Sequence, residues 1–307
     1  MEPIKCSLIP EALEADVILI SARMSRDLHR QLTHLITENK HHERCVLFLT
    51  TFGGDPDGAY RIARCLRHNY KDHLRIVVPS FCKSAGTLLV IAADELAIGD
   101  LGELGPLDVQ VSKPTEIDEV SSCLDIKQAL DSIISHSQSA FWNYLTSIKR
   151  RGQLSTRIAA EISYQFSAQL FSSLVAQIDP QRLGEMDRAN TIAFSYGERL
   201  DTYSKSLQSR ESLSSLILGY PSHSFVIDRK EAGTLFTNVM CPTDWENDFY
   251  QQFAAILDEP REITEFFVYG KDAGDTNEND GGTDNECKKS TEPEVASELS
   301  ELPDGSN

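Results

Sequence analysis

Short apolar runs alternate with amphipathic segments along the first hundred residues. Four runs rich in Val, Ile and Leu predict buried strands, at residues 17–20, 45–50, 74–78 and 96–99. Three segments with apolar side chains at helical spacing predict helices, at residues 26–39, 57–68 and 87–93. Strands that alternate with helices pair in parallel through right-handed crossovers, so the pattern predicts an α/β fold.

The pattern changes beyond residue 110. Residues 113–118 form a polar segment with a proline, and residues 122–150 carry a long apolar stripe at helical spacing. Further helices are predicted at residues 155–171 and 187–205. We therefore expect one domain over residues 1–265, with helical insertions at about 113–205.

Charge is unevenly distributed along the 307 residues. The net charge of −18 argues against nucleic acid or an anionic membrane as a partner, because both repel an acidic surface. From Lys271 onward the chain has three lysines against eleven acidic residues and few large apolar side chains. That composition predicts a disordered acidic tail over residues 271–307.

The cysteines and the N-terminus indicate a compartment. Seven scattered cysteines without a C-x-x-C pair suit a reducing cytosol. Neither a signal peptide nor an apolar run of 18 residues is present, so we expect a cytoplasmic protein without stable membrane insertion. The histidines lack metal-binding spacing, and no phosphate-binding or dinucleotide glycine pattern follows a strand. We therefore expect neither a metal nor a cofactor.

Two segments carry the candidate chemistry. Gly53 and Gly54 follow the strand at 45–50, and paired glycines let backbone N–H groups turn toward a ligand, as an oxyanion hole requires. Ser84 lies between the strand at 74–78 and an apolar helix, where the helix N-terminus favours developing negative charge. Taken singly, the glycines could form a plain turn and Ser84 could be an N-cap. Their order along the chain favours a serine hydrolase site.

That order resembles the superfamily of Clp-type proteases, signal-peptide peptidase A and crotonases. Within it, segments 83–88 (Lys-Ser-Ala-Gly-Thr-Leu) and 104–110 (Leu-Gly-Pro-Leu-Asp-Val-Gln) are most similar to the serine dehydrogenase proteinase family. The resemblance covers residues 16–110 and, more loosely, 177–239. It implies a spiral of ββα units with additional helices, acyl-enzyme chemistry on Ser84 and a homo-oligomer.

A serine nucleophile needs a base, and two candidates stay open. Lys127 lies in the region from which signal-peptide-peptidase-like enzymes draw a lysine base; the alternative is a solvated lysine on an amphipathic helix. His223 precedes a segment that resembles the one after the third triad residue of Clp-type proteases, and Asp108 falls near their histidine position. A Ser84–His223–Asp108 triad would exchange the acid and the imidazole. The alternative for His223 is a loop residue that caps a turn.

Two neighbours of Ser84 are candidates for substrate binding. Lys83 could present its charge to a substrate carboxylate or pair with Asp55 or Asp57, and Gly86 could allow close approach of a substrate backbone. Asp55 and Asp57 fit the start of the helix at 57–68, where acids are favourable.

The function expected from these segments is an ATP-independent serine peptidase that acts on peptides or unfolded protein. The alternatives are a crotonase-like acyl-CoA enzyme and a catalytically inactive scaffold of the same fold. Ser84 favours the peptidase, because enolate stabilisation on acyl-CoA does not require a serine nucleophile.

Overall fold

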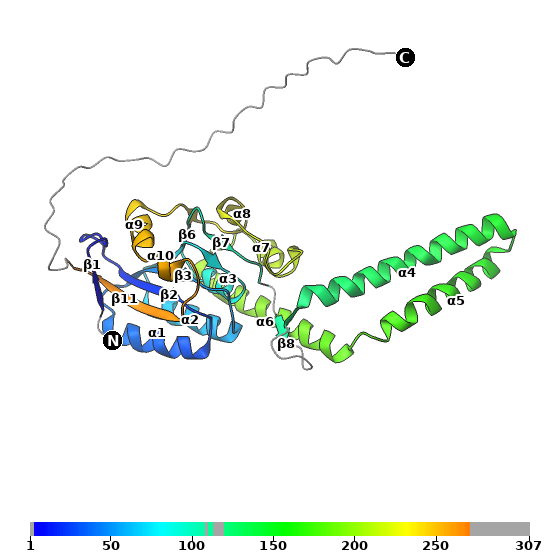
Figure 1. Ribbon diagram of the computed structural model, residues 1–307, viewed down its shortest axis with the longest axis horizontal. Coiled ribbons are helices and arrows are strands. Elements are labelled where there is room, and N and C mark those ends of the chain that lie inside the picture. Colours follow the sequence, from blue (N-terminus) through cyan, green and yellow to red (C-terminus); the bar gives the residue numbers. More distant parts are fainter. Residues whose placement is uncertain (1–2, 108–109, 113–119, 271–307) are drawn as a thin grey trace, which may run out of the picture. The chain divides into compact units, whose positions relative to one another are not determined.

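The computed structural model describes residues 3–107, 110–112 and 120–270, and describes side chains over 3–107 and 129–270 (Figure 1). These residues belong to one compact unit, Met1–Asp272. The predicted tail at 271–307 lies outside the described residues. The last strand extends to Tyr269, four residues beyond the predicted domain end at 265.

The core is a seven-stranded sheet with the order β1-β11-β2-β3-β4-β6-β10. Every neighbouring pair is parallel except β11 and β2, which are antiparallel. The bounds are β1 Ile4–Cys6, β2 Asp16–Ser21, β3 Arg44–Thr50, β4 His73–Val78, β6 Glu95–Ile98, β10 Val239–Met240 and β11 Ile263–Tyr269. The predicted α/β class with a mainly parallel sheet is therefore confirmed.

The central strands are apolar on both faces because each face is covered. Ile18 and Ile20 pack with the helices α1 (Arg26–Asn39), α2 (Pro56–Asn69) and α3 (Ala85–Val90). The alternate positions Val17 and Leu19 pack on the other face with Phe249 of α9 (Asp244–Gln252) and Leu257 of α10 (Ala254–Leu257). Burial on both faces explains the continuous apolar runs that predicted these strands.

The helix predicted at 87–93 is earlier and shorter than expected. After Val90, the N–H groups of Ala92 and Ala93 bond to carbonyls three residues back, at Leu89 and Val90, so the chain tightens into a turn. The apolar side chains from Leu88 to Ala93 are buried throughout. The apolar run therefore reports burial and not helix length.

The middle of the chain is helical, as predicted. The elements are α4 Cys123–Gly152, α5 Thr156–Val175, α6 Pro180–Ser204, α7 Arg210–Ser214, the π-helix η1 Ser215–Gly219 and α8 Arg229–Leu235. Helices α4 and α5 pack side by side as a hairpin (Figure 1). Helix α6 begins seven residues before the predicted start at 187, because Asp179 caps it and Pro180 stands at its first position. Among the described helices, none is both long and apolar enough to span a membrane.

Two small sheets complete the fold. Strands β5 (Phe81–Cys82) and β7 (Glu103–Leu104) pair in parallel, and β8 (Gln110–Ser112) pairs with β9 (Val120–Ser122) in antiparallel fashion. The β5–β7 pair positions the segment before Ser84 against the segment after β6.

Candidate active site

The two segments that carry the predicted chemistry meet in space. The end of β3 pairs with the strand before Ser84: the Thr51 N–H donates to the Phe81 carbonyl at 2.7 Å, and the Lys83 N–H donates to the Thr51 carbonyl at 3.0 Å. At Gly53, a Cβ atom would lie only 2.8 Å from the Ser84 Cβ. The glycine pair and Ser84 are therefore in direct contact.

Ser84 has a strained backbone. It occupies the N-cap position of α3 with φ of 51° and ψ of −115°, and its side chain makes no capping bond. For comparison, Lys205 ends α6 at φ of 51° and ψ of 38°, an ordinary left-handed helix end. Non-glycine residues outside that region at positive φ cost about 1–3 kcal/mol and cluster at functional sites. Ser84 therefore stands at the N-cap position of α3, but its side chain does not cap the helix.

Gly53 and Gly54 use their freedom at positive φ, with values of 100° and 137°. The Gly53 N–H is occupied, since it donates to the Thr51 hydroxyl at 3.0 Å. The Gly53 carbonyl accepts from the Met24 N–H at 2.8 Å. No bond from the Gly54 N–H forms within the described part of the chain, so Gly54 is the better placed donor of the pair.

A second donor lies beside Gly53. The Ala85 nitrogen would be 3.3 Å from a Cβ atom at Gly53. As the first residue of α3, Ala85 has an N–H without an acceptor inside the helix. This donor was not among the candidates predicted from the sequence, although the position of Ala85 directly after the serine is the signal for one.

Gly86 packs closely against Thr51 and Cys82, and does not face an open space for substrate. A Cβ atom there would lie 2.4 Å from Cγ2 of Thr51 and 2.9 Å from Sγ of Cys82. The space that Gly86 leaves open therefore lets α3 pack on the end of β3. The thiol of Cys82 lies next to Ser84 in the chain, but burial raises its pKa, so it is not a thiolate nucleophile.

The side chain of Lys83 is buried. Its Nζ is 2.6 Å from a carboxylate oxygen of Glu103 and donates to the carbonyls of Leu104 at 3.2 Å and Phe225 at 3.3 Å. Of the two alternatives left open for Lys83, pairing with Asp55 or Asp57 is replaced by pairing with Glu103, which the β5–β7 pairing places beside Phe81. Lys83 directly precedes Ser84, and its side-chain contacts stabilise the turn that leads to Ser84.

The two aspartates start a helix, as predicted. The Asp55 carboxylate caps α2 by accepting the N–H groups of Asp57 and Gly58 at 3.0 and 3.1 Å. Asp57 accepts from the Tyr196 hydroxyl at 2.8 Å and pairs with Arg26 at 2.6 Å. The Tyr196 hydrogen bond, together with Arg26, lowers the pKa of Asp57.

Of the two candidate bases, the structure describes the side chain of His223 but not that of Lys127. His223 lies in the loop between η1 and α8 and is half-buried. Two anchors hold this loop near Lys83: the Phe225 carbonyl accepts from Lys83, and Ile227 exchanges two backbone bonds with Leu104, at 2.9 and 3.0 Å. Lys127 belongs to the first turns of α4, but its side chain lies outside the described side chains, as does Asp108 entirely. Both candidate bases stay open.

No protein-family model and no curated protein sequence matches the chain. Among solved structures, it is similar to a serine-to-alanine mutant of the 1510-N membrane-bound stomatin-specific protease, with a TM-score of 0.44, 13% identity, and coverage of 84% of this chain and 97% of that chain. A lysine-to-alanine mutant of the same protease, in complex with a substrate peptide, has a TM-score of 0.42, 12% identity, and coverage of 85% and 95%. The chemistry of the site therefore has to follow from its own residues.

Proposed function

We propose that the protein is a serine-type peptidase that cleaves peptide bonds through an acyl-enzyme on Ser84. The observation that carries this proposal is the strained backbone of Ser84 in contact with Gly53, which also lies beside the Ala85 nitrogen and precedes Gly54 in the chain. Strain of this kind persists only where the surrounding structure enforces it. A surface serine with no role would relax into an ordinary cap.

The reaction follows from these groups. The Ser84 hydroxyl oxygen attacks the peptide carbonyl carbon while a base takes the hydroxyl proton. The carbonyl oxygen becomes an oxyanion, which accepts hydrogen bonds from Gly54 and Ala85. The base then gives its proton to the leaving amine, and water hydrolyses the acyl-enzyme to regenerate the serine.

We assign the base to Lys127, with His223 as the alternative. A Ser–Lys pair requires one residue to act, whereas the His223 triad requires Asp108 and His223 to exchange roles relative to the resembling proteases. Lys83 is not assigned as the base in this scheme, because its Nζ is held by the Glu103 carboxylate and by the carbonyls of Leu104 and Phe225.

The wider assignment rests on the resemblance of segments 83–88 and 104–110. With it we propose membership of the serine dehydrogenase proteinase family, the spiral of ββα units, and an ATP-independent cytoplasmic homo-oligomer that takes peptides or unfolded protein.

A fluorophosphonate probe tests the proposal directly, because it reacts covalently with activated serines. The purified protein should be labelled on Ser84, and Ser84→Ala should abolish labelling with almost no change in melting temperature. Ser222→Ala, an exposed serine in the His223 loop, is the matched control and should label normally. Labelling that persists in Ser84→Ala would exclude this serine, and a folded wild type that never labels would favour the inactive scaffold or the acyl-CoA enzyme.

Ser84→Gly adds a test of the strain itself. Glycine adopts positive φ without penalty, so this variant should lose labelling and gain about 1–2 kcal/mol in unfolding free energy. A destabilised Ser84→Gly would show that the backbone is not strained.

A further inference from the structure

A cavity lies at the opposite end of the strands from Ser84. It has a volume of about 340 Å³, and Arg44, His73 and Glu95, the first residues of β3, β4 and β6, line it. Ser84 follows the other end of β4, which is roughly 17 Å away at about 3.3 Å per residue. We call this cavity the Arg44 pocket, and it is separate from the proposed peptidase site.

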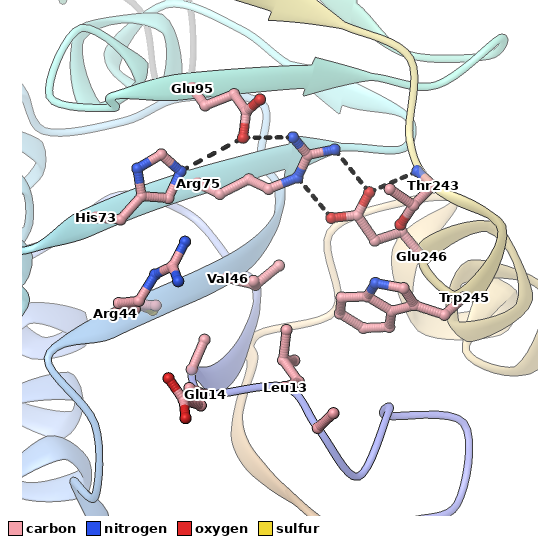
Figure 2. Close-up of a pocket in the computed structure, with 13 residues that line it drawn as sticks. Leu13, Glu14, Arg44, Val46, His73, Arg75, Glu95, Thr243, Trp245 and Glu246 are labelled. Atoms are coloured by element: carbon pink, nitrogen blue, oxygen red, sulfur yellow. Dashed lines mark hydrogen bonds and ion pairs between the residues drawn. The ribbon is translucent and has the colours of Figure 1, made fainter. Parts of the chain in front are cut away.

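One wall of the Arg44 pocket is a closed ion network (Figure 2). Arg75 binds both carboxylate oxygens of Glu246, at 2.7 and 2.9 Å, and pairs with Glu95 at 2.6 Å. Glu246 is 1% exposed and also accepts the Thr243 N–H at 2.7 Å. His73 contacts Glu95 at 3.4 Å. These groups satisfy one another, so this wall is rigid and has no free cation to offer.

Arg44 differs from Arg75. It is exposed, and Figure 2 shows it beside the pocket with no ion pair to any of the residues drawn. A guanidinium presents a planar fork of donors that matches one carboxylate. Arg44 is therefore the group in this pocket that is able to hold an anion.

Across the pocket from the ion network most of the labelled side chains are apolar, and Glu14 lies next to Leu13 (Figure 2). Trp245, Leu13 and Val46 line this side of the pocket, and the Trp245 ring is fixed edge-on against the buried Phe48 at 5.9 Å between ring centroids (Figure 2). An anchored indole gives a flat apolar surface at low entropic cost. The pocket thus combines one available cation with an apolar surface.

We propose that the Arg44 pocket binds a small monocarboxylate that carries a bulky apolar group. The carboxylate pairs with Arg44, and the apolar group packs among Leu13, Val46 and Trp245. The volume falls in the range of small-molecule sites. A dianion such as phosphate is disfavoured, because Glu14, Glu95 and Glu246 also line the cavity. This chemistry occurs in free aromatic acids and in the C-terminal residue of a peptide.

The protein contains the reporter that the test needs. The chain has two tryptophans, and replacing Trp142 with Phe leaves Trp245 as the sole source of indole fluorescence. In this background, N-acetyl-L-phenylalanine represents a peptide C-terminus and phenylacetate represents a free acid. If only N-acetyl-L-phenylalanine changes the Trp245 emission saturably, the ligand is a peptide C-terminus. If phenylacetate does so as well, the pocket accepts the wider class of apolar acids. N-acetyl-L-phenylalaninamide, which lacks the carboxylate, should bind at least about tenfold more weakly.

Variants complete the experiment. Arg44→Gln should weaken binding of the acids by about tenfold or more, whereas Arg30→Gln, which removes an exposed arginine on α1, should leave it unchanged. Ser84→Ala should bind normally, so failure of this proposal and failure of the peptidase proposal are distinguishable. Equal binding of the acid and the amide, tighter binding of inorganic phosphate, or no saturable change at millimolar acid would each overturn the proposal.

Discussion

Substituting Gly53 with alanine tests whether the glycine pair and Ser84 form one site. The new Cβ atom would lie 2.8 Å from the Ser84 Cβ and 2.9 Å from the Lys83 carbonyl oxygen. Both neighbours belong to the backbone turn that holds Ser84, so neither is able to rotate away as a flexible side chain would. The turn itself has to move.

Two contributions determine how much unfolding free energy Gly53→Ala should lose. Placing alanine at φ of 100° costs about 1–3 kcal/mol. Forcing one extra methyl into a packed site costs about 1–3 kcal/mol more. The sum is about 2–6 kcal/mol, which is on the order of 10 °C in melting temperature for a unit of this size. Catalysis should suffer in addition, because a displacement of the nucleophile by about 1 Å costs on the order of a hundredfold in rate.

The assay is the rate of fluorophosphonate labelling, measured below the melting temperature of the variant, together with a thermal melt. Gly233→Ala is the matched control, because a Cβ atom there meets nothing within 4 Å inside α8. This control should label at the wild-type rate and be more stable by up to about 1 kcal/mol. Wild-type labelling by Gly53→Ala would refute the contact between the two segments as a requirement for reactivity.

Three further outcomes are expected. Arg75→Met should lower the unfolding free energy by about 3–5 kcal/mol, because the carboxylates of Glu95 and Glu246 stay buried without their cation; a loss below about 1 kcal/mol in chemical denaturation would contradict this. Burial alone would raise the pKa of Glu95, but Arg75 and His73 hold it below its ordinary value. The stability that this pairing contributes is therefore fully present above the pKa of Glu95 in the unfolded chain, and it is lost as the pH falls through the pKa of Glu95 in the folded protein. The unfolding free energies of wild type and Arg75→Met should converge in acid. In single-turnover acylation, Lys127→Ala should be inactive and His223→Ala should be active. The wild-type acylation rate should rise toward alkaline pH, because a lysine base acts only when it is neutral. An active Lys127→Ala, an inactive His223→Ala and a rate that reaches its plateau by neutral pH would establish the rearranged triad. The apolar side chains exposed along α5 should be covered in a homo-oligomer, and light scattering that shows a monomer at micromolar concentration would exclude this.

Much of the sheet was predictable because its strands are buried on both faces. The helix at Arg26–Asn39 matches its prediction at both ends, since Ser25 caps it and Leu28, Leu32, Leu35 and Ile36 repeat along one face. Strand β11 (Ile263–Tyr269) was missed, although its run of Ile, Phe, Val and Tyr is typical of a strand. Its antiparallel place beside β2 depends on contacts across most of the chain, which no local pattern encodes.

The candidate site was predictable only in part. The meeting of Gly53 with Ser84 follows from parallel strands whose carboxyl ends share one edge of the sheet. The pairing of Lys83 with Glu103 depends on the two-residue strands β5 and β7, which are too short to give a periodic signal. The Arg75–Glu246 pair joins positions 171 residues apart, so charge patterning along the chain gives no indication of it.

The backbone hydrogen bonds of Thr51 allow hydrogen exchange to measure how stably the two segments of the proposed site stay together. The amide hydrogens of Thr51 and Lys83 are held by the bonds that join β3 to the turn before Ser84. Their exchange with deuterium requires that junction to open, so their protection measures how often the glycine segment and the serine separate. That quantity is accessible in the resting protein, before any substrate is known.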